Sequence, residues 1–180
     1  MKIISAPAGL SGEPLAELKQ WLAITTSNDD ALLVDLLGAA HAMCERFTGI
    51  VPYKCEVRER FAGAGTEYRL SARPVLYFLA ASGIEHGLGK RQLDTAEAAF
   101  ERTDTDGGTL VLAAPLPEPQ VEAHYYAGLS DDWSRLEEGL RHGILRCAAH
   151  FYRERDTGPD ERLPAAIAAL WRPYRRMHLL

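Results

Sequence analysis

The hydrophobic repeat of this chain changes twice, and each change marks a boundary in the fold. From about residue 29 to 48, apolar side chains recur every three to four residues, as on one face of a helix. From Tyr53 the repeat becomes two, because Cys55, Val57 and Phe61 alternate with charged residues, as in a strand with one solvated face. Helical spacing returns at about residue 131. This order of helices, strands and helices predicts an α+β fold.

The predicted parts make one domain of 180 residues. It consists of a helical bundle of about four helices, an inserted small antiparallel β-sheet and a C-terminal arm. The parts follow one another as helices at about 13–48, a β-rich insertion at about 52–128, a helix at about 131–155, and a C-terminal helix and arm at 163–180.

Residues that favour helix ends support these boundaries. Ser11, Glu13 and Ser27 are candidate caps, Pro14 suits a first helical turn, and Gly49 suits a helix end. Ser130 is the candidate start of the third helix, while Pro164 can begin the fourth and Pro173 should end it near Trp171. Gly139 and Gly143 weaken the third helix, so we expect them to permit close packing against another backbone.

Turn residues divide the β-rich insertion. A short apolar run at 75–79 follows Pro74, and 120–128 alternates through Val121, Ala123 and Tyr125. Between them, residues 98–115 predict a hairpin whose turn lies around Asp106, Gly107 and Gly108.

Charge and cysteine content exclude several protein classes. The formal net charge of -5 argues against a protein that holds nucleic acid through a basic surface. Three widely spaced cysteines do not suggest a secreted disulfide scaffold. No apolar run is long enough for a signal peptide or a membrane span, so we expect no membrane partner and synthesis in the host cytoplasm, where the protein stays unless it leaves as part of something larger.

A metal site is the first chemical possibility to weigh. His41 with Cys44, and Cys147 with His150, have ligand spacing on predicted helices and would together supply four zinc ligands. Both cysteines lie on apolar stripes, however, and a free cysteine is commonly a small buried hydrophobic residue. We expect core packing and no metal.

Catalytic and cofactor motifs are also weak. The sequence has no glycine-flanked nucleophile elbow. The stretch GLGKRQ at 87–92 lacks the spacing of a phosphate-binding loop and predicts a solvated loop, and DTDGG at 104–108 predicts a turn rather than a calcium loop. We therefore expect no enzyme, no catalytic residues and no cofactor.

The end of the chain, LPAAIAALWRPYRRMHLL at 163–180, combines aromatic residues, leucines and arginines. This composition is typical of the centre of a protein–protein interface. We expect an exposed arm whose deletion from residue 170 onward would leave a folded protein. The alternative is that the terminal helix packs on its own bundle.

Four motifs in this order resemble one known family, the head-tail connector (adaptor) proteins of long-tailed bacteriophages and phage-like gene transfer agents. They are the opening helix pair LAELKQWLAITTSNDDALLVDLLGAAHAMCERFTG, the strand VEAHYYAGL, the helix LRHGILRCAAHFYRERD and the closing LPAAIAALWRPYRRM. Together they cover most of the chain outside about 55–120.

The resemblance implies a structural protein in the neck of a virion or phage-like particle, at the head-tail interface. It implies a homo-oligomeric ring, expected to be a dodecamer, that docks on the portal protein and links it to a stopper or tail-completion protein. DNA would pass through the channel without sequence-specific binding. The implied portal-binding arm contains Leu170, Trp171, Pro173, Tyr174, Arg175, Arg176 and Met177.

Two other classes remain open on the sequence alone. A small DNA-binding or DNA-packaging accessory protein would use RPYRR at 172–176 to contact phosphates, with strongly salt-dependent affinity. A hydrolytic or metal enzyme would require a bound ion or an active-site pair. The resemblance also leaves open phage versus gene transfer agent, the ring size, the helix faces that join subunits, the oligomeric state before docking and the role of the β insertion.

Overall fold

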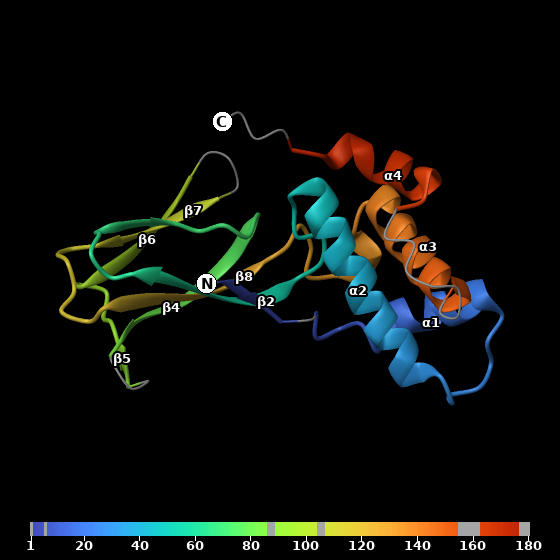
Figure 1. Cartoon of the computed structure of the whole chain (residues 1–180), viewed down its shortest axis with the longest axis horizontal. Coiled ribbons are helices and arrows are strands. Elements are labelled where there is room, and N and C mark those ends of the chain that lie inside the picture. Colours follow the sequence, from blue (N-terminus) through green and yellow to red (C-terminus); the bar gives the residue numbers. More distant parts are fainter. Residues whose placement is uncertain (1, 6, 86–88, 104–106, 155–162, 177–180) are drawn as a thin grey trace. The chain divides into compact units, whose positions relative to one another are not determined.

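The computed structural model describes residues 2–5, 7–85, 89–103, 107–154 and 163–176. The chain forms two compact units, which are distinguished in Figure 1 by their strands and their helices. The sheet unit contains Met1–Ala6 and Lys54–Gly128, and the helical unit contains Pro7–Tyr53 and Leu129–Leu180. The predicted α+β class, with helices around an inserted antiparallel β region, is confirmed.

The described part of the sheet unit has eight strands in two antiparallel sheets rather than the single small sheet that we expected. They are β1 (Lys2–Ile4), β2 (Cys55–Ala62), β3 (Glu67–Arg69), β4 (Val75–Ile84), β5 (Lys90–Gln92), β6 (Ala98–Arg102), β7 (Gly108–Leu112) and β8 (Gln120–Ala127). One sheet has the order β1-β2-β8-β4-β5 and the other β3-β7-β6.

Alternation along β2 and β8 sets the two faces of the larger sheet. Val57 pairs with Tyr125, both fully buried, while their neighbours Arg58 and His124 pair on the opposite face. The two sheets contact each other through Phe78 on β4 and Phe100 on β6, whose rings stack with centroids 5.0 Å apart. The predicted hairpin is confirmed as β6 and β7, although residues 104–106 of its turn lie outside the described residues.

The prediction of a solvated loop at GLGKRQ, residues 87–92, is wrong for the last three residues. Lys90–Gln92 form strand β5, which pairs with Ser82–Ile84 of β4, instead of a solvated loop. A segment of three residues is too short to show the alternation that distinguishes a strand from a loop in the sequence. Its conformation is decided by pairing with β4.

The described part of the helical unit has four α-helices and two short 3-10 helices. They are α1 (Glu13–Leu22), α2 (Asp30–Thr48), η1 (Trp133–Arg135), α3 (Glu138–Glu154), α4 (Ala165–Trp171) and η2 (Arg172–Tyr174). Leu18, Leu37 and Leu140 are fully buried where α1, α2 and α3 pack together. No helix in the described ranges is long and apolar enough to cross a membrane.

Several predicted helix ends are confirmed and others are wrong. Pro14 lies in the first turn of α1, and Gly49 ends α2 in a left-handed conformation with a φ of 73°. The predicted caps Ser11, Glu13 and Ser27 are wrong, because Gly12 and Asp29 occupy the cap positions without a side-chain bond and Glu13 is already the first residue of α1.

The predicted helix from about 131 to 155 is interrupted. Asp132 has an extended backbone and accepts a hydrogen bond from the Ser134 amide at 3.0 Å, so it caps η1 rather than continuing a long helix from Ser130. Leu136 is also extended, and α3 begins only at Glu138. The side-chain bond of Asp132 competes successfully with helical pairing at this point.

Candidate protein-interaction surface

The C-terminal segment, residues 163–176, packs on α2 and α3 of its own unit. Pro164 precedes the first turn of α4, and the helix ends at Trp171 because Pro173 cannot supply the backbone amide that another turn requires. Both predicted boundaries are confirmed. The chain then continues as η2 to Tyr174.

Glycines on α3 make room for the aromatic residues of this segment. A Cβ atom on Gly143 would lie 2.1 Å from Trp171 Nε1, and one on Gly139 would lie 2.8 Å from the Tyr174 hydroxyl. Real side chains do not tolerate such distances. The expectation that these glycines permit close packing is therefore confirmed, with aromatic rings rather than a second backbone as the neighbours.

Burial corrects the expectation that the whole segment is exposed. Trp171 is 0% exposed and contacts Phe47 of α2, with ring centroids 6.1 Å apart, while Leu170 and Tyr174 are partly buried. Burial, followed by a hydrogen bond to Glu137, raises the pKa of Tyr174. Deleting the chain from residue 170 would remove a core indole, so we predict that the deletion destabilises the remainder of the helical unit.

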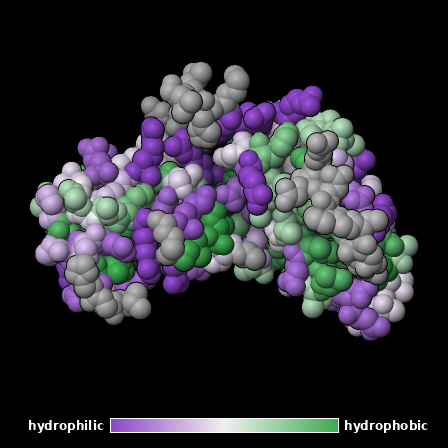
Figure 2. All heavy atoms as spheres, in the orientation of Figure 1, coloured by the Kyte–Doolittle hydropathy of each residue, from purple (hydrophilic) through white to green (hydrophobic). Residues whose placement is uncertain are grey.

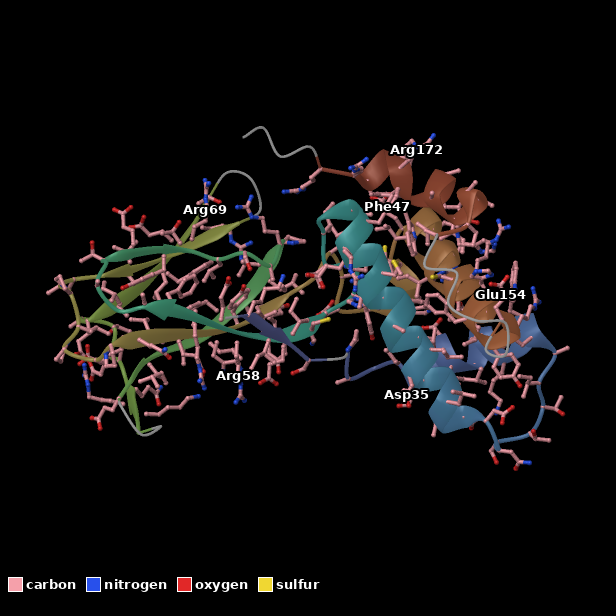
Figure 3. The ribbon with its side chains drawn as sticks, in the orientation of Figure 1. Asp35, Phe47, Arg58, Arg69, Glu154 and Arg172 are labelled. Atoms are coloured by element: carbon pink, nitrogen blue, oxygen red, sulfur yellow. The ribbon has the colours of Figure 1, made fainter. Side chains whose placement is uncertain are left out.

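The basic residues of the segment lie at its surface. Arg172, Pro173 and Arg175 are exposed, and Figure 3 shows Arg172 pointing away from α2 and Phe47 on the side of α2 nearest the segment. The Arg175 guanidinium lies 5.8 Å from the centre of the Phe47 ring. The Arg176 amide donates to the Thr48 carbonyl at 2.9 Å, which fixes the segment to the end of α2. Met177 lies outside the described residues.

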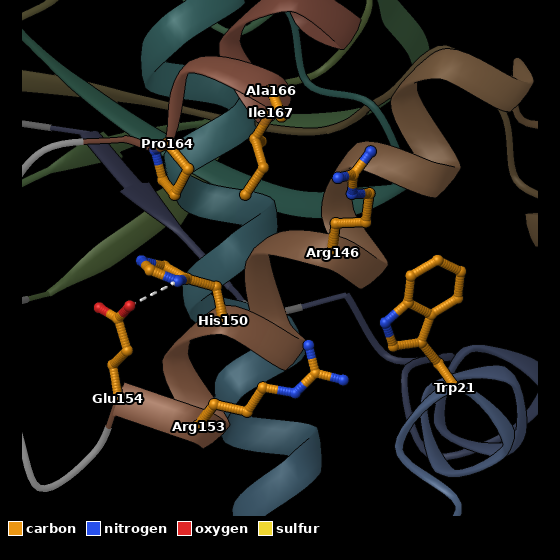
Figure 4. Close-up of a pocket in the computed structure, with 8 residues that line it drawn as sticks. All are labelled: Trp21, Arg146, His150, Arg153, Glu154, Pro164, Ala166 and Ile167. Carbon is orange, nitrogen blue, oxygen red and sulfur yellow. Dashed lines mark ion pairs between the residues drawn. The ribbon is translucent and has the colours of Figure 1, made fainter.

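A groove of about 340 Å³ lies between α1, α3 and the start of α4 (Figure 4). We call it the basic groove. Its lining residues are Trp21, Arg146, His150, Arg153, Glu154, Pro164, Ala166 and Ile167. His150 pairs with Glu154 at 3.2 Å, whereas neither arginine has an ion-pair partner among the described residues.

A second groove of about 450 Å³ lies at the other end of α1, and we call it the acidic groove. It is lined by Gly9, Glu13, Pro14, Tyr53, Asp131, Asp132, Trp133 and Arg135. Burial, followed by the charges of Asp132, Asp131 and Glu13, raises the pKa of Tyr53. Three carboxylates therefore line one groove with the Tyr53 phenol, and the largely exposed Arg135 pairs with one of them, Asp132 at 3.4 Å.

The two cysteines considered as zinc ligands pack in the core, whereas His41 contacts the Tyr53 backbone and His150 lines the basic groove. Cys44 and Cys147 are fully buried in the helical core, where burial raises the pKa of Cys44 and raises that of Cys147 to about 12. The expectation of core packing is confirmed. His41 Nε2 lies 3.1 Å from the Tyr53 carbonyl oxygen and accepts from the Tyr53 amide in the neutral tautomer suited to that bond. No group of three metal-ligating side chains occurs within the described ranges.

Buried carboxylates in the sheet unit were missed by the sequence analysis. Glu122 is 3% exposed and pairs with Lys90 and with Arg60, the latter at 2.7 Å. Burial raises its pKa, but the hydrogen bonds from Lys90 and Arg60 outweigh burial, and the pKa is lowered. These residues come from β2, β8 and β5, and only the pairing of β2 with β8, of β8 with β4 and of β4 with β5 brings them together.

Two further carboxylates show the same long-range dependence. Arg91 binds Glu118 at 2.6 Å and lowers its pKa. Glu59 accepts from the Tyr125 hydroxyl at 2.8 Å and from the Ser71 amide at 2.9 Å. These contacts satisfy buried charge within the unit and form no arrangement of nucleophile and base.

Comparison with known proteins finds similarity at the level of structure. No protein-family model matches the sequence, and no curated protein matches it. A chain from the neck of an empty GTA particle with C6 symmetry is 24% identical with a TM-score of 0.74, and the match covers 100% of this chain and 97% of that one. A chain from the virion of a native gene transfer agent particle is 23% identical, with a TM-score of 0.73 and the same coverage of both chains.

A chain from the neck of a native GTA particle with C12 symmetry is 24% identical with a TM-score of 0.73, again over 100% of this chain and 97% of that one. At this level of identity the likeness establishes the fold. The expected resemblance to connector proteins is confirmed in that sense, since the chain shares its fold over its full length with chains of gene transfer agent particles.

Proposed function

We propose that this protein is a structural subunit of the neck of a tailed phage or gene transfer agent particle. The observation that carries the proposal is the full-length match to chains from such particles, with TM-scores of 0.73 to 0.74. A match over nearly the whole of both chains is better support than a shared sub-fold, because it includes the sheet unit and the helical unit in one order along the chain.

In this proposal, both units form one connector protomer, and about a dozen protomers form a ring at the head-tail interface. The C12 symmetry of one matched neck structure supports that number. The ring docks on the portal protein on one side and meets a stopper or tail-completion protein on the other. DNA crosses the central channel, and a formal net charge of -5 favours passage over retention.

The C-terminal segment is the proposed portal contact, but only its exposed residues can touch the portal, because its aromatic residues pack on the bundle. Trp171 and Tyr174 hold the segment on the bundle, while Arg172, Pro173 and Arg175 lie at the surface. Exposed guanidinium groups suit paired hydrogen bonds to portal carboxylates. The arginines therefore supply the contact, and the aromatic residues determine where the arginines lie.

Reconstitution with the portal ring tests this proposal. Wild-type protein is mixed with purified portal, and bound mass and symmetry are measured by mass photometry and electron microscopy. We expect a ring of added subunits on the portal. A double variant, Arg172→Ala with Arg175→Ala, should bind at least about tenfold more weakly because it loses charge-assisted contacts without losing the core.

Arg58→Ala with Arg69→Ala provides the matched control, since it removes the same charge from exposed positions in the sheet unit. This control should bind the portal normally. Failure of the wild-type protein to associate with either portal or tail-completion protein would contradict the connector role. Normal binding of the Arg172/Arg175 variant would instead reject only the C-terminal segment as the contact.

A further inference from the structure

We propose that the basic groove of one protomer binds the acidic groove of a second copy, and that this contact joins neighbours in the ring. The inference rests on the proposed connector function for its setting, but its argument comes from the helical unit itself. Each protomer carries both halves of the contact, as a head-to-tail interface that closes by rotation requires.

The basic groove has the features of a binding surface rather than of a solvated helix face. Trp21 is 42% exposed, and His142 packs edge-on against its ring with centroids 5.0 Å apart. Figure 4 shows the Arg153 side chain extending from α3 toward the side on which Trp21 lies. A partly exposed tryptophan, two arginines without described carboxylate partners and the buried Ile167 beside them combine apolar area with charge.

The acidic groove supplies the complementary chemistry. Glu13 and Asp131 are exposed and have no ion-pair partner among the described residues. Tyr53 lies against the backbone there, since a Cβ atom on Gly9 would be 2.4 Å from its hydroxyl, and its ring packs edge-on against Trp133 with centroids 5.7 Å apart. The phenol thus offers an aromatic surface between carboxylates, which suits an incoming guanidinium.

The two grooves are held apart within one protomer. Glu13 and Trp21 lie eight residues apart on the single rigid helix α1, which separates the grooves by roughly 12 Å along its axis. Their charges are opposite and their lining residues do not overlap. Complementary surfaces that are held apart on one rigid body favour contact between copies.

Charge reversal tests the contact. The first variant, Arg146→Glu with Arg153→Glu, makes the basic groove acidic, and the second, Glu13→Lys with Asp131→Lys, makes the acidic groove basic. Asp132 is left unchanged because it caps η1. We expect each variant alone to self-associate at least about tenfold more weakly than wild type, because like charges then face each other. Circular dichroism and thermal melting confirm that each variant is folded.

Mixing the two variants is the decisive experiment. In an equimolar mixture, the reversed groove of each variant meets a groove of opposite charge on the other, so alternating assemblies should form and self-association should recover. Arg58→Glu with Arg69→Glu in the sheet unit is the control and should behave as wild type. Self-association is measured by sedimentation velocity over a range of salt and protein concentrations, and ring filling is measured on the portal.

These outcomes separate the inference from the connector role. If wild type fills the portal ring and both single-groove variants also fill it, the groove contact is wrong and the connector role stands. If wild type does not bind portal but self-associates in the predicted pattern, the groove contact stands without that role. If wild type does not self-associate under either condition, or if the mixture fails to recover while each variant is folded, the inference is wrong.

Discussion

In the helical unit, Trp171 is fully buried against Gly143, whereas in the sheet unit the nearly buried Glu122 is held between Lys90 and Arg60. The first arrangement depends on shape and the second on compensated charge. The buried polar residues also differ between the units. Those of the helical unit, His41 and Thr48, carry no carboxylate, whereas those of the sheet unit are the three glutamates Glu59, Glu118 and Glu122. Both units also combine hydrophobic and hydrophilic patches on the face seen in Figure 2.

Close glycine contacts occur in both units, since a Cβ atom on Gly108 would lie 2.1 Å from the Phe100 ring, so what separates the units is the buried charge of the sheet unit. Excess volume beside Trp171 should disrupt the helical unit, because a Cβ atom on Gly143 would already lie 2.1 Å from the indole nitrogen. Loss of the Glu122 carboxylate should weaken the sheet unit, because Lys90 and Arg60 then lose the anion that they share. Substitutions in each unit can therefore break or sharpen the comparison.

The largest effect is expected for Gly143→Val. The added side chain would overlap Trp171, so we expect destabilisation of the helical unit by about 3 kcal/mol. Gly38→Ala is the matched control on α2, where a Cβ atom would lie 3.9 Å from Leu10 and the helix should gain about 0.5 to 1 kcal/mol. Urea unfolding followed by tryptophan fluorescence measures both changes. Equal effects of the two substitutions would remove the shape argument.

Acid should weaken the helical unit at a higher pH than the sheet unit. Burial lowers the pKa of His41 from 6.5 to about 4, so the unfolded chain binds that proton more readily. Above pH 6.5 His41 is neutral in both states and the helical unit keeps its full free energy of unfolding. As the pH falls toward 4, the unfolded chain takes up the proton first, and the free energy of unfolding decreases by roughly 3 kcal/mol in all. The pKa of Glu122 is lowered from its ordinary value of 4.5, so its charge stabilises the sheet unit above that pH. This stabilisation is lost only at lower pH, where the folded protein becomes protonated at Glu122.

Tryptophan fluorescence reports on the helical unit, because the three tryptophans of the chain lie there. Amide hydrogen exchange of β8 reports on the sheet unit. We expect the fluorescence-detected stability to fall between pH 6.5 and 4 before β8 loses protection, and His41→Gln should flatten that first fall. Simultaneous loss of both signals at each pH would argue against separate acid responses.

A smaller effect is expected for Glu122→Gln. The substitution keeps the shape of the side chain but removes the charge that Arg60 and Lys90 share, at a cost of about 1 to 2 kcal/mol. Glu56→Gln is the surface control, since its pairs with Arg58 and His124 are exposed or half-buried and should contribute less than about 1 kcal/mol. Amide hydrogen exchange of β8, measured at increasing denaturant concentration, gives the stability of the sheet unit in each of the two variants. A larger loss from Glu56→Gln would reverse the proposed importance of burial.

Periodic sequence features predicted much of the secondary structure. The apolar stripe of α2, the end of that helix at Gly49 and the strand alternation around Val57 are local properties of the backbone and of side-chain spacing. Helix termination near Pro173 is local for the same reason, since proline lacks the required amide. These elements can be read without knowledge of their neighbours.

The fate of the C-terminal segment could not be read in that way. Its leucine, tryptophan and arginine residues suit either an exposed arm or a helix packed on its own bundle, and Gly143 decides in favour of packing by accommodating Trp171. Likewise, the charges of the acidic groove come from both chain segments of the helical unit, Glu13 from the first and Asp131 from the second. No local pattern links residues so far apart.

The sequence by itself determined the α+β order, most helix and strand positions and the concentration of arginine and aromatic residues at the end of the chain. Only the tertiary structure decided which of those residues are buried, which carboxylates share cations and which grooves carry opposite charge. The physical reason is range. Periodicity, capping and turns act over a few residues, whereas burial and charge compensation depend on side chains that the fold brings together from distant positions.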